Sequence, residues 1–537
     1  MPGTVTQHRS HFALLGGLAA RDHVVCLVLE KKEVARGSGM DRRVFLQSAV
    51  AAGVSAASTP VLAAKFAALT EVSSNINAVT GSHAAIEIER AAVQELSDSL
   101  RGNLLLPGNA GYETARRVLN GGIDKHPAFV VQPVGATDIR NAVRFARERE
   151  LLLAVKCGGH SYAGKSTCDG GMQIDLSTLR HARVDAKSRI AHVAGGSLLG
   201  EIDRESMAVG LVTTAGTVSH TGVGGLTTAG GFGRVGRRFG LALDNVRSVD
   251  VVTADGQLLH ASAEENEDLY WGIRGGGGNF GIVVNFEFAL HPMQRTVVGG
   301  DILYPGSMVR EVFETYREHG VTATDDLYCD VFAGSGMEGT DSIAGFHVCW
   351  SGPENEAEKV LAPLRALGTP IVDTVKAWDY VELQRSGDNT EPRNDAQYMK
   401  AGFINDVPDS LIDAIANGLE PKDRRAVFLY CQQSGGAIGR VPANATAFAH
   451  RKSVANMFVI VSWPNEDDDA PHVNYIRNYW KSLESATDGY YTVDTSDEPR
   501  AVRHGNYQVN FPRLMELKKK YDPTNLFRLN ANINPHA

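Results

Sequence analysis

The glycine-rich stretch AVKCGGHSYAGKSTCDGG, residues 154–171, decides how the rest of the chain is interpreted. It places one histidine and two cysteines among five glycines. Cys157, His160, Cys168 and Asp169 all carry groups that can bind a metal ion, so a metal site is one interpretation. Such a site needs a second pair of ligands at a spacing comparable to the C-x-x-H pair, and none follows in this sequence.

The same stretch also has the composition of a phosphate-binding loop. Gly158, Gly159 and Gly164 allow successive backbone N–H groups to converge on an anion, and Ser161 and Ser166 can add hydroxyl donors. The third interpretation is a plain strand-to-strand loop whose histidine faces solvent. Glycines alone do not choose between these interpretations.

The segments around this loop alternate between strand and helix patterns. The sequence predicts a strand at Ala128–Gln132, a helix at Thr137–Arg149 and a strand at Leu151–Val155, directly before the loop. Thr137 is the expected N-cap, because it precedes a helical apolar face. Further along, residues 246–262 read as a hairpin with its turn at 254–256. This half of the chain is therefore expected to be compact α+β.

The second half has a different pattern. From about residue 294 to 494, helical segments such as Ser307–Gly320 and Glu354–Leu367 alternate with apolar strand segments. This pattern predicts a second domain with an antiparallel sheet and helices on one side. The tail then contains a helix with Leu514 and Leu517 on one face, which should stop at Asp522-Pro523.

Composition limits the class of protein. The 537 residues are 43% hydrophobic and 21% charged, with a formal net charge of −9, so no nucleic-acid partner is expected. Beyond the N-terminal region, no apolar stretch is long enough to span a bilayer. The six cysteines are too sparse to suggest a disulfide scaffold.

The N-terminal region reads as an export signal. From Met40 the chain runs MDRRVFLQSAVAAGVSAASTPVLAAKF, with paired arginines, an apolar stretch and a small-x-small cleavage site. We predict a twin-arginine signal at residues 40–64, with translation starting at Met40 and residues 1–39 an upstream mis-start. The mature protein is then expected in the periplasm or outside the cell.

Two G-x-G-x-x-G matches do not indicate a nicotinamide site. The dinucleotide fingerprint needs a strand before it and a helix after it. The match at Gly231–Gly236 follows a loop-like segment, and the match at Gly276–Gly281 leads into a strand. A Rossmann-type site is therefore disfavoured.

Four motifs taken together carry a family resemblance. They are KCGGHSYAGKS (156–166), GTVSHTGVGGLTTAGGFGRVGRRFGLALDNVRSVDVVTADG (216–256), LYWGIRGGGGNFGIVVNFEF (269–288) and YDPTNLFRLNANI (521–533). In order and spacing they resemble the berberine bridge enzyme-like FAD-linked oxidoreductases, of bacterial type, in the vanillyl-alcohol oxidase and p-cresol methylhydroxylase (PCMH) flavin superfamily. The resemblance covers about Asp124 to Pro535.

The resemblance implies a fold and a division into domains. The expected class is α+β, with a two-subdomain FAD-binding domain of the vanillyl-alcohol oxidase type. Residues 85–293 would form this PCMH-type FAD domain, and residues 294–500 a substrate domain whose antiparallel sheet is covered by helices. Residues 501–537 would return to the FAD domain.

The resemblance also implies a cofactor site. The opening loop becomes a cradle for the FAD pyrophosphate, with His160 attached covalently to the 8α-methyl carbon of the flavin. Bicovalent relatives carry a second linking cysteine where this chain has Val218, so a mono-covalent FAD is expected. Lys156 stands where arginine is common, and Cys157 where a smaller residue is common. The expected FAD-binding residues are His160, Lys156, Cys157, Gly158, Gly159, Ser161, Tyr162, Gly164, Ser166, Val218, Ser219, Gly222, Gly224, Gly225, Gly281, Ile282, Val283, Asn530 and Asn532; no metal is expected.

The implied activity is FAD-dependent oxidation. A small alcohol, sugar or amine would donate a hydride to FAD, and O₂ would reoxidise the flavin with release of H₂O₂. The alternatives are a dehydrogenase with another electron acceptor, and a biosynthetic flavoprotein that performs oxidative ring chemistry. The expected partners are a small-molecule substrate and the electron acceptor, without nucleic acid or membrane, in a monomer or homodimer.

Two tyrosines are the candidate catalytic bases. Tyr491 falls where relatives carry the tyrosine of a Y-x-N strand, although Val493 replaces the asparagine. Tyr507 is a second candidate of the same type. A tyrosinate can act as a base if neighbouring cations lower its pKa. The alternative is that either side chain simply packs at the domain interface.

Overall fold

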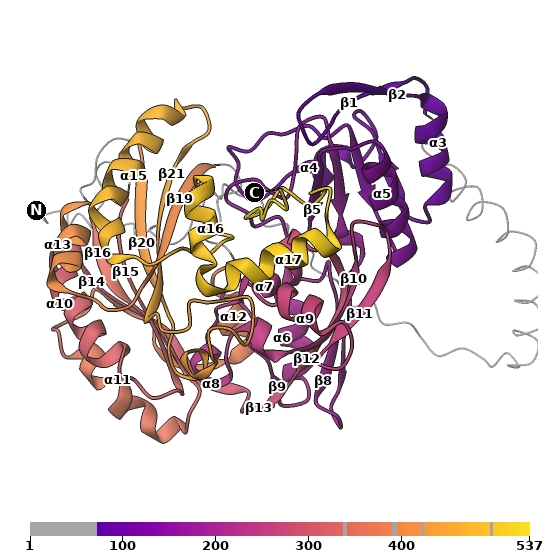
Figure 1. Cartoon of the computed structure of the whole chain (residues 1–537). Helices are drawn as coiled ribbons and strands as arrows, with labels where there is room; N and C mark the ends of the chain where they lie inside the picture. Colours follow the sequence, from indigo (N-terminus) through magenta and orange to yellow (C-terminus); the bar gives the residue numbers. More distant parts are fainter. Residues whose placement is uncertain (1–71, 337–340, 389–394, 420–423, 495–497, 537) are drawn as a thin grey trace, which may run out of the picture.

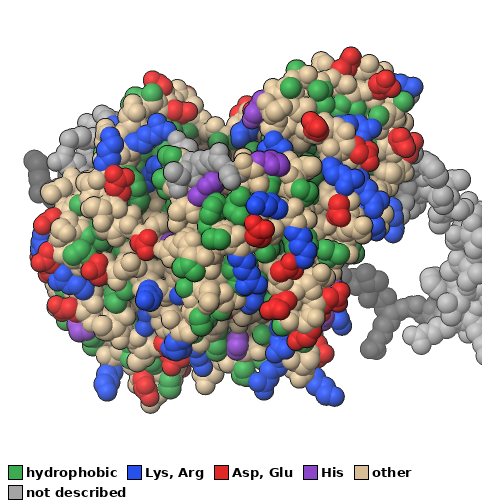
Figure 2. Space-filling model, viewed as in Figure 1, with side chains coloured by type: hydrophobic (Ala, Val, Ile, Leu, Met, Phe, Trp, Pro, Cys, Tyr) green, Lys and Arg blue, Asp and Glu red, His purple; other side chains and the backbone are tan. Residues whose placement is uncertain are grey.

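The computed structural model describes residues 72–336, 341–388, 395–419, 424–494 and 498–536. The predicted mis-start at 1–39 and the predicted signal at 40–64 lie outside these residues. Two lobes stand side by side (Figure 1), the first formed by the indigo-to-magenta part of the chain and the second mainly by the orange part. Acidic and basic side chains are interspersed over the face shown in Figure 2. No helix among the described residues is long and apolar enough to cross a membrane.

The first lobe begins with a four-stranded sheet in the order β3-β4-β6-β5. Its strands are β3 (Asn103–Leu105), β4 (Phe129–Gln132), β5 (Leu153–Lys156) and β6 (Met172–Asp175). Strands β4 and β5 each pair with β6 in parallel. The helix α5 (Ala136–Glu148) connects β4 to β5, and its buried face carries the apolar residues that predicted it.

The start of α5 differs from the prediction. Thr137 lies inside the helix, because Gly135 is the N-cap residue. The carboxylate of Asp138, in the first turn, accepts hydrogen bonds from Val134 N, Arg101 N and Gly102 N, each at 3.0 Å, and none of these donors belongs to the helix. Asp138 therefore ties the start of the helix to the segments beside it, and a negative charge in the first turn also suits the helix dipole.

A five-stranded antiparallel sheet completes the first lobe, in the order β11-β10-β12-β8-β7. Its strands are β7 (Ala182–Asp185), β8 (Ile190–Ala194), β10 (Val246–Val252), β11 (Leu258–Ser262) and β12 (Ile282–Ala289). The predicted hairpin is formed by β10 and β11, with Gly256 N donating to Thr253 O at 2.9 Å in the turn. Smaller elements of this lobe are β1 (Ile76–Val79), β2 (Ala85–Ile88), α3 (Arg90–Ser99), α4 (Tyr112–Arg116), α6 (Leu199–Met207), β9 (Leu211–Val212), α7 (Val223–Ala229), α8 (Gly236–Phe239), α9 (Glu267–Ile273) and β13 (His291–Pro292).

The second lobe is built on one large antiparallel sheet, in the order β17-β14-β16-β15-β20-β21-β19 with β18 beside β14. The strands are β14 (Thr296–Pro305), β15 (Leu327–Ser335), β16 (Ile343–Trp350), β17 (Val372–Asp373), β18 (Lys376–Asp379), β19 (Asp395–Ile404), β20 (Ala426–Gln433) and β21 (Ala455–Pro464). Helices cover its outer face: α10 (Val309–Thr315), α11 (Ala357–Arg365), α13 (Asp409–Asn417) and α15 (Asp469–Leu483). This arrangement confirms the predicted sheet with helices on one side, and with it the α+β class.

The other face of this sheet turns toward the first lobe. Tyr328 and Cys349 on that face pack in one buried cluster with Val212 and Val235 of the first lobe. A polar chain crosses the same boundary. Arg234 donates to Gln384 Oε1 at 2.6 Å, and Gln384, in α12 (Tyr380–Arg385), donates to Asp203 Oδ2 at 3.0 Å.

The C-terminal helix lies against the first lobe. In Figure 1, α17 (Phe511–Tyr521) runs from the small helix α16 (Arg500–Asn506) toward that lobe. Another small helix, α14 (Ala437–Arg440), packs against α8. Leu514 and Leu517 pack in one buried cluster with Trp271 and Phe280. The helix ends at Asp522, as its Asp-Pro sequence predicted. The residues that follow reach the strands and loops of the first lobe.

Candidate active site

The glycine loop and a second glycine segment meet backbone to backbone. The loop of residues 157–166 leaves the carboxyl end of β5. A Cβ atom placed on Gly158 would lie only 2.4 Å from Gly222 N, and one placed on Gly222 would lie 2.4 Å from Gly158 N. Only glycine permits so close an approach. The glycines of these two motifs therefore join two segments that are about sixty residues apart in the sequence.

His160 sits where the two segments meet and contacts a second histidine. Its Nε2 lies 2.8 Å from His220 Nδ1, and its Nδ1 lies 3.2 Å from Thr221 Oγ1. The two imidazole rings are 4.8 Å apart between centroids. One of the two nitrogens in the short contact must carry a proton and the other must accept it. When His160 is the donor, its Nδ1 is the ring nitrogen with a lone pair, and the Thr221 hydroxyl can donate to it.

A cavity of about 390 Å³ opens beside His160, within the range of small-molecule and cofactor sites. Both lobes and the C-terminal segment contribute to its wall. Of the residues expected to bind FAD, the wall includes Cys157, Gly158, Gly159, His160, Ser161, Tyr162, Ser166, Val218, Gly222, Gly224, Gly225, Gly281, Ile282, Val283 and Asn530. The structure thus brings together fifteen of the nineteen expected residues, from four separate parts of the sequence.

The other four expected residues do not line this cavity. Lys156 is buried beneath the loop, where its Nζ lies 3.6 Å from Asp175 Oδ2, so its charge is neutralised within the protein. Ser219 donates its Oγ hydrogen to Asp388 Oδ2 at 2.7 Å. Gly164 forms a turn with a φ of +63°. Asn532 lies in the C-terminal segment beyond the cavity wall, with a buried Oδ1 that has no hydrogen-bond partner among the described residues.

The cavity wall carries polar atoms that lack partners within the protein. Ser166 Oγ and Asn530 Oδ1 are buried, and neither has a hydrogen-bond partner among the described residues. Unsatisfied buried groups are costly, so such atoms indicate a polar ligand. A Cβ on Gly225 or on Gly277 would meet no atom within 4 Å. Open space beside these backbones, together with unsatisfied donors and acceptors, fits a large polar cofactor such as FAD.

Tyr491 and Tyr507 both line the cavity, but their hydroxyl groups bind backbone groups. Tyr491 Oη accepts a hydrogen bond from Gly231 N at 2.8 Å and lies 3.3 Å from Leu226 O. Burial raises the pKa of Tyr491 well above its usual value. Tyr507 donates its hydroxyl hydrogen to Ala531 O at 2.9 Å. For Tyr491 these features favour packing at the domain interface over the role of base.

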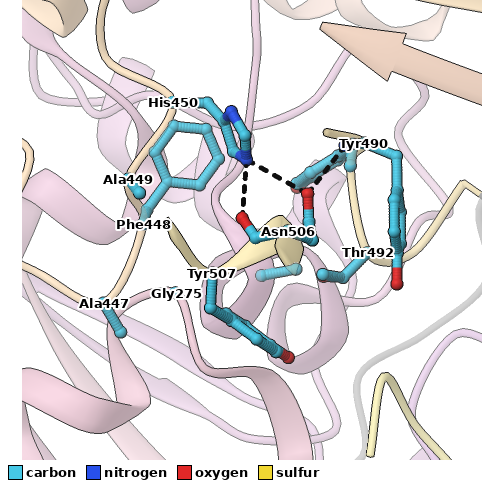
Figure 3. Close-up of a pocket in the computed structure, with 11 residues that line it drawn as sticks. Gly275, Ala447, Phe448, Ala449, His450, Tyr490, Thr492, Asn506 and Tyr507 are labelled. Atoms are coloured by element: carbon cyan, nitrogen blue, oxygen red, sulfur yellow. Dashed lines mark hydrogen bonds between the residues drawn. The ribbon is translucent and has the colours of Figure 1, made fainter. Parts of the chain in front are cut away.

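A small buried pocket behind Tyr491 fixes the segment that carries it. Figure 3 shows the His450 ring directed at Asn506. Its Nε2 lies 2.8 Å from Asn506 O, while Asn506 Oδ1 accepts a hydrogen bond from Tyr490 N at 2.7 Å. Burial lowers the pKa of His450, which favours the neutral imidazole. The space inside is only about 10 Å³, so this pocket holds the chain in place rather than a ligand.

The side chains around the opening loop are not arranged as a metal site. Among the described residues, no three or more His, Cys, Asp or Glu side chains are grouped to hold a metal ion. Cys168 is buried, with its Sγ 3.6 Å from Met172 O. Burial raises the pKa of Cys168 to about 12, which disfavours the thiolate that metals bind.

Three residues of the site were not among the sequence-based candidates. His220 lies inside the second motif, and a histidine in a motif of the cofactor site could have been named as a candidate from the sequence. Lys165 and Asp494 also line the cavity. Burial raises the pKa of Asp494 to about 7, while a hydrogen bond from Asn456 Nδ2 at 2.9 Å and the charge of Lys165 act in the opposite direction. Nothing in the local sequence around Asp494 indicated that it would line the cavity.

Comparison with known proteins matches this geometry. A family model described as "FAD binding domain" matches residues 127–262, and one described as "Berberine and berberine like" matches residues 496–534. An FAD-linked oxidoreductase of Dictyostelium discoideum is 29% identical over 82% of this chain and 97% of its own length. Xylooligosaccharide oxidase of Thermothelomyces thermophilus is 27% identical over 86% of this chain and 97% of its own length.

Solved structures agree on the fold. The crystal structure of 6-hydroxy-D-nicotine oxidase from Arthrobacter nicotinovorans superposes with a TM-score of 0.73 and 25% identity, covering 81% of this chain and 98% of that one. The regions that the two family models match contain the glycine loop, the second glycine segment and the C-terminal segment, which all contribute to the cavity wall. The two family models and these relatives support a berberine bridge enzyme-like FAD-linked oxidoreductase.

Proposed function

We propose that this FAD-dependent oxidoreductase holds its flavin through a single covalent bond to His160. The observation that carries the proposal is the position of His160, on the cavity wall with His220 in short contact on one side of its ring. Val218, which stands where bicovalent relatives have a second linking cysteine, also lines the cavity. Because valine cannot form such a bond, one attachment is expected.

The chain's own residues have separate tasks in holding the cofactor. Backbone N–H groups of the loop at 157–161 would bind the pyrophosphate, with Ser161 and Ser166 adding hydroxyl groups. Asn530, with its unsatisfied Oδ1, would hold a polar part of the cofactor from the C-terminal side. When bound, FAD supplies the two-electron acceptor for the substrate's hydride. We assign residues 85–293 and 501–537 to the binding of FAD and residues 294–500 to the binding of substrate.

His220 is proposed to position His160 for this attachment. A proton held between His160 Nε2 and His220 Nδ1 leaves the lone pair of the other His160 nitrogen available as the nucleophile. We expect His220→Ala to bind FAD but to attach it more slowly, so that acid releases a large share of the flavin. The measurement is the acid-soluble flavin fraction at successive times after expression.

His192→Ala is a matched control for this variant. His192 pairs with Glu287 on the sheet of the first lobe, with its Nδ1 3.2 Å from Glu287 Oε1, and does not line the cavity. This control should attach flavin like the wild type. Wild-type kinetics of attachment in His220→Ala would contradict the positioning role.

The proposed reaction is oxidation of a small alcohol, sugar or amine with O₂ as the final acceptor. The relatives support this range, since one is named for a xylooligosaccharide and a solved one for 6-hydroxy-D-nicotine. Screening alcohols, sugars and amines by anaerobic bleaching of the flavin, followed by an H₂O₂ assay in air, tests the proposal. Bleaching without H₂O₂ release would instead indicate a dehydrogenase with another electron acceptor.

We also propose that the protein is exported by the twin-arginine route. Arg42-Arg43 ahead of an apolar, small-residue stretch supports it. N-terminal sequencing of protein from the native host should begin near Ala64 or Lys65. Intact protein that includes residues 1–39, recovered from the cytoplasm, would contradict export and the mis-start together.

A further inference from the structure

The second lobe presents one polar corner to the cavity. Gln432 at the end of β20 and Asn456 at the start of β21 are directly paired across the two strands, so their side chains share one face of the sheet. Asn456 is fully buried, and its Nδ2 donates to Asp494 Oδ2 at 2.9 Å. Gln432 and Asp494 both line the cavity. The carboxylate is thus held in a fixed place by a buried amide.

Beside this corner the wall is apolar and rigid. Met399 and Phe458, from β19 and β21, line the cavity. The Phe458 ring stacks on Tyr430 with centroids 5.3 Å apart, and Tyr430 stacks on Phe332 at 5.9 Å. The Tyr430 hydroxyl donates to Asp330 Oδ2 at 2.5 Å, which fixes the middle ring of the stack. A flat apolar surface next to the Asp494 carboxylate fits a substrate that has a flat apolar body and a hydroxyl or amino group.

We propose that Asp494 accepts the proton from the hydroxyl or amino group of the substrate, and that this group is borne by a flat, apolar body that packs on Phe458 and Met399. The expected substrates are therefore aromatic or alicyclic alcohols and amines rather than oligosaccharides. This inference rests on the proposed FAD-dependent oxidation in the same cavity, and it assigns the base to Asp494 in place of Tyr491.

The reaction balances with the groups named. The Asp494 carboxylate takes the proton of the O–H or N–H bond, and the electron pair of that bond forms the C=O or C=N double bond. The neighbouring C–H bond breaks, and its hydrogen leaves with both electrons to oxidised FAD. O₂ then takes two electrons and two protons to give H₂O₂. A positioned base of this kind contributes about 10²–10⁴-fold to the rate.

The environment of Asp494 sets the sign of the pH dependence. Burial raises its pKa to about 7, and the charged or titratable groups that face it are Lys165 from the glycine loop and Tyr491 from its own segment. Below pH 7 the carboxyl group holds its proton and cannot accept another. Above pH 7 it is ionised, so it can accept a proton and can also attract a cation.

Binding of benzylamine to the FAD-loaded protein, with the flavin first reduced by dithionite and O₂ excluded so that no hydride can be transferred, is measured by calorimetry and tests the site without turnover. Benzylamine is a cation with a flat apolar body across the range from pH 6 to pH 8. Ionisation of a group with a pKa near 7 should strengthen its binding roughly tenfold between these two values. Asp494→Asn should abolish this increase while the protein keeps its covalent flavin and its melting temperature. Cellobiose should not bind measurably.

Asp488→Asn is the matched control, because Asp488 is an exposed carboxylate on the same segment that does not line the cavity. This variant should keep the pH-dependent increase. With whichever alcohol or amine bleaches the wild-type flavin, Asp494→Asn should lower the reduction rate about a hundredfold or more. Unchanged benzylamine binding in Asp494→Asn, or tight binding of cellobiose, would overturn the proposal. Loss of all flavin from the acid-precipitated wild type would instead overturn only the covalent link.

Discussion

Replacing Lys518 by methionine is expected to destabilise the fold by about 3–5 kcal/mol. The Lys518 side chain is fully buried in α17, where its Nζ donates to Asp522 Oδ2 at 2.6 Å, Asn279 O at 2.8 Å and Phe527 O at 2.9 Å. Burial lowers its pKa to about 8, so the amine still carries its charge at pH 7. Methionine keeps the apolar stem but leaves the equally buried Asp522 carboxylate without its cation.

Urea unfolding of Lys518→Met beside the wild type measures this loss. The variant should also bind FAD less tightly, because Lys518 holds the backbone at Phe527, three residues before Asn530 on the cavity wall. Lys519→Met is the control: that side chain is about half exposed and pairs at the surface with Glu516 at 3.1 Å, so its change should stay below about 0.5 kcal/mol. Equal unfolding midpoints for the two variants would contradict the role given to Lys518.

Replacing His160 by alanine is expected to abolish covalent attachment of the flavin completely. The variant should still fold and bind FAD, because the contacts proposed for the pyrophosphate come from backbone groups of the loop. Its flavin should be released entirely into the supernatant on acid precipitation. Substrate oxidation should also be slower, since the unlinked flavin is a weaker electron acceptor.

Absorbance of the supernatant and pellet after acid precipitation measures the attachment directly. His126→Ala serves as the control, because His126 precedes β4, its side chain is 55% exposed, and it does not line the cavity. This control should retain its flavin in the pellet. Flavin that stays with the pellet of His160→Ala would place the covalent bond on another residue.

Local patterns in the sequence predicted more of the fold than of the site. The buried face of α5 could be predicted because its apolar residues recur with the helical period. The loop at 157–166 could be predicted because its glycines permit backbone conformations and close approaches that other residues do not. The N-cap at Thr137 was wrong, since the helix already begins at Ala136, where Asp138 binds two neighbouring segments that only the folded chain brings together.

The sequence analysis missed some contacts of the site for the same reason: they are tertiary contacts. His220 meets His160 only because Gly158 and Gly222 bring two segments into backbone contact. Asp494 becomes a half-buried, hydrogen-bonded acid only when β21 presents Asn456 to it, 38 positions away in sequence. Such encounters depend on packing between elements, which neither periodicity nor motif spacing encodes.

The most direct test of the covalent link is peptide mapping of the wild-type protein after acid precipitation. Trypsin should release residues 157–165 as one peptide, between Lys156 and Lys165, with His160 as its only histidine. This peptide should carry the mass of one FAD, and the peptide of residues 205–234, which contains Val218 and His220, should carry none. Flavin recovered wholly in the acid supernatant, or attached to the peptide of residues 205–234, would contradict a single bond at His160.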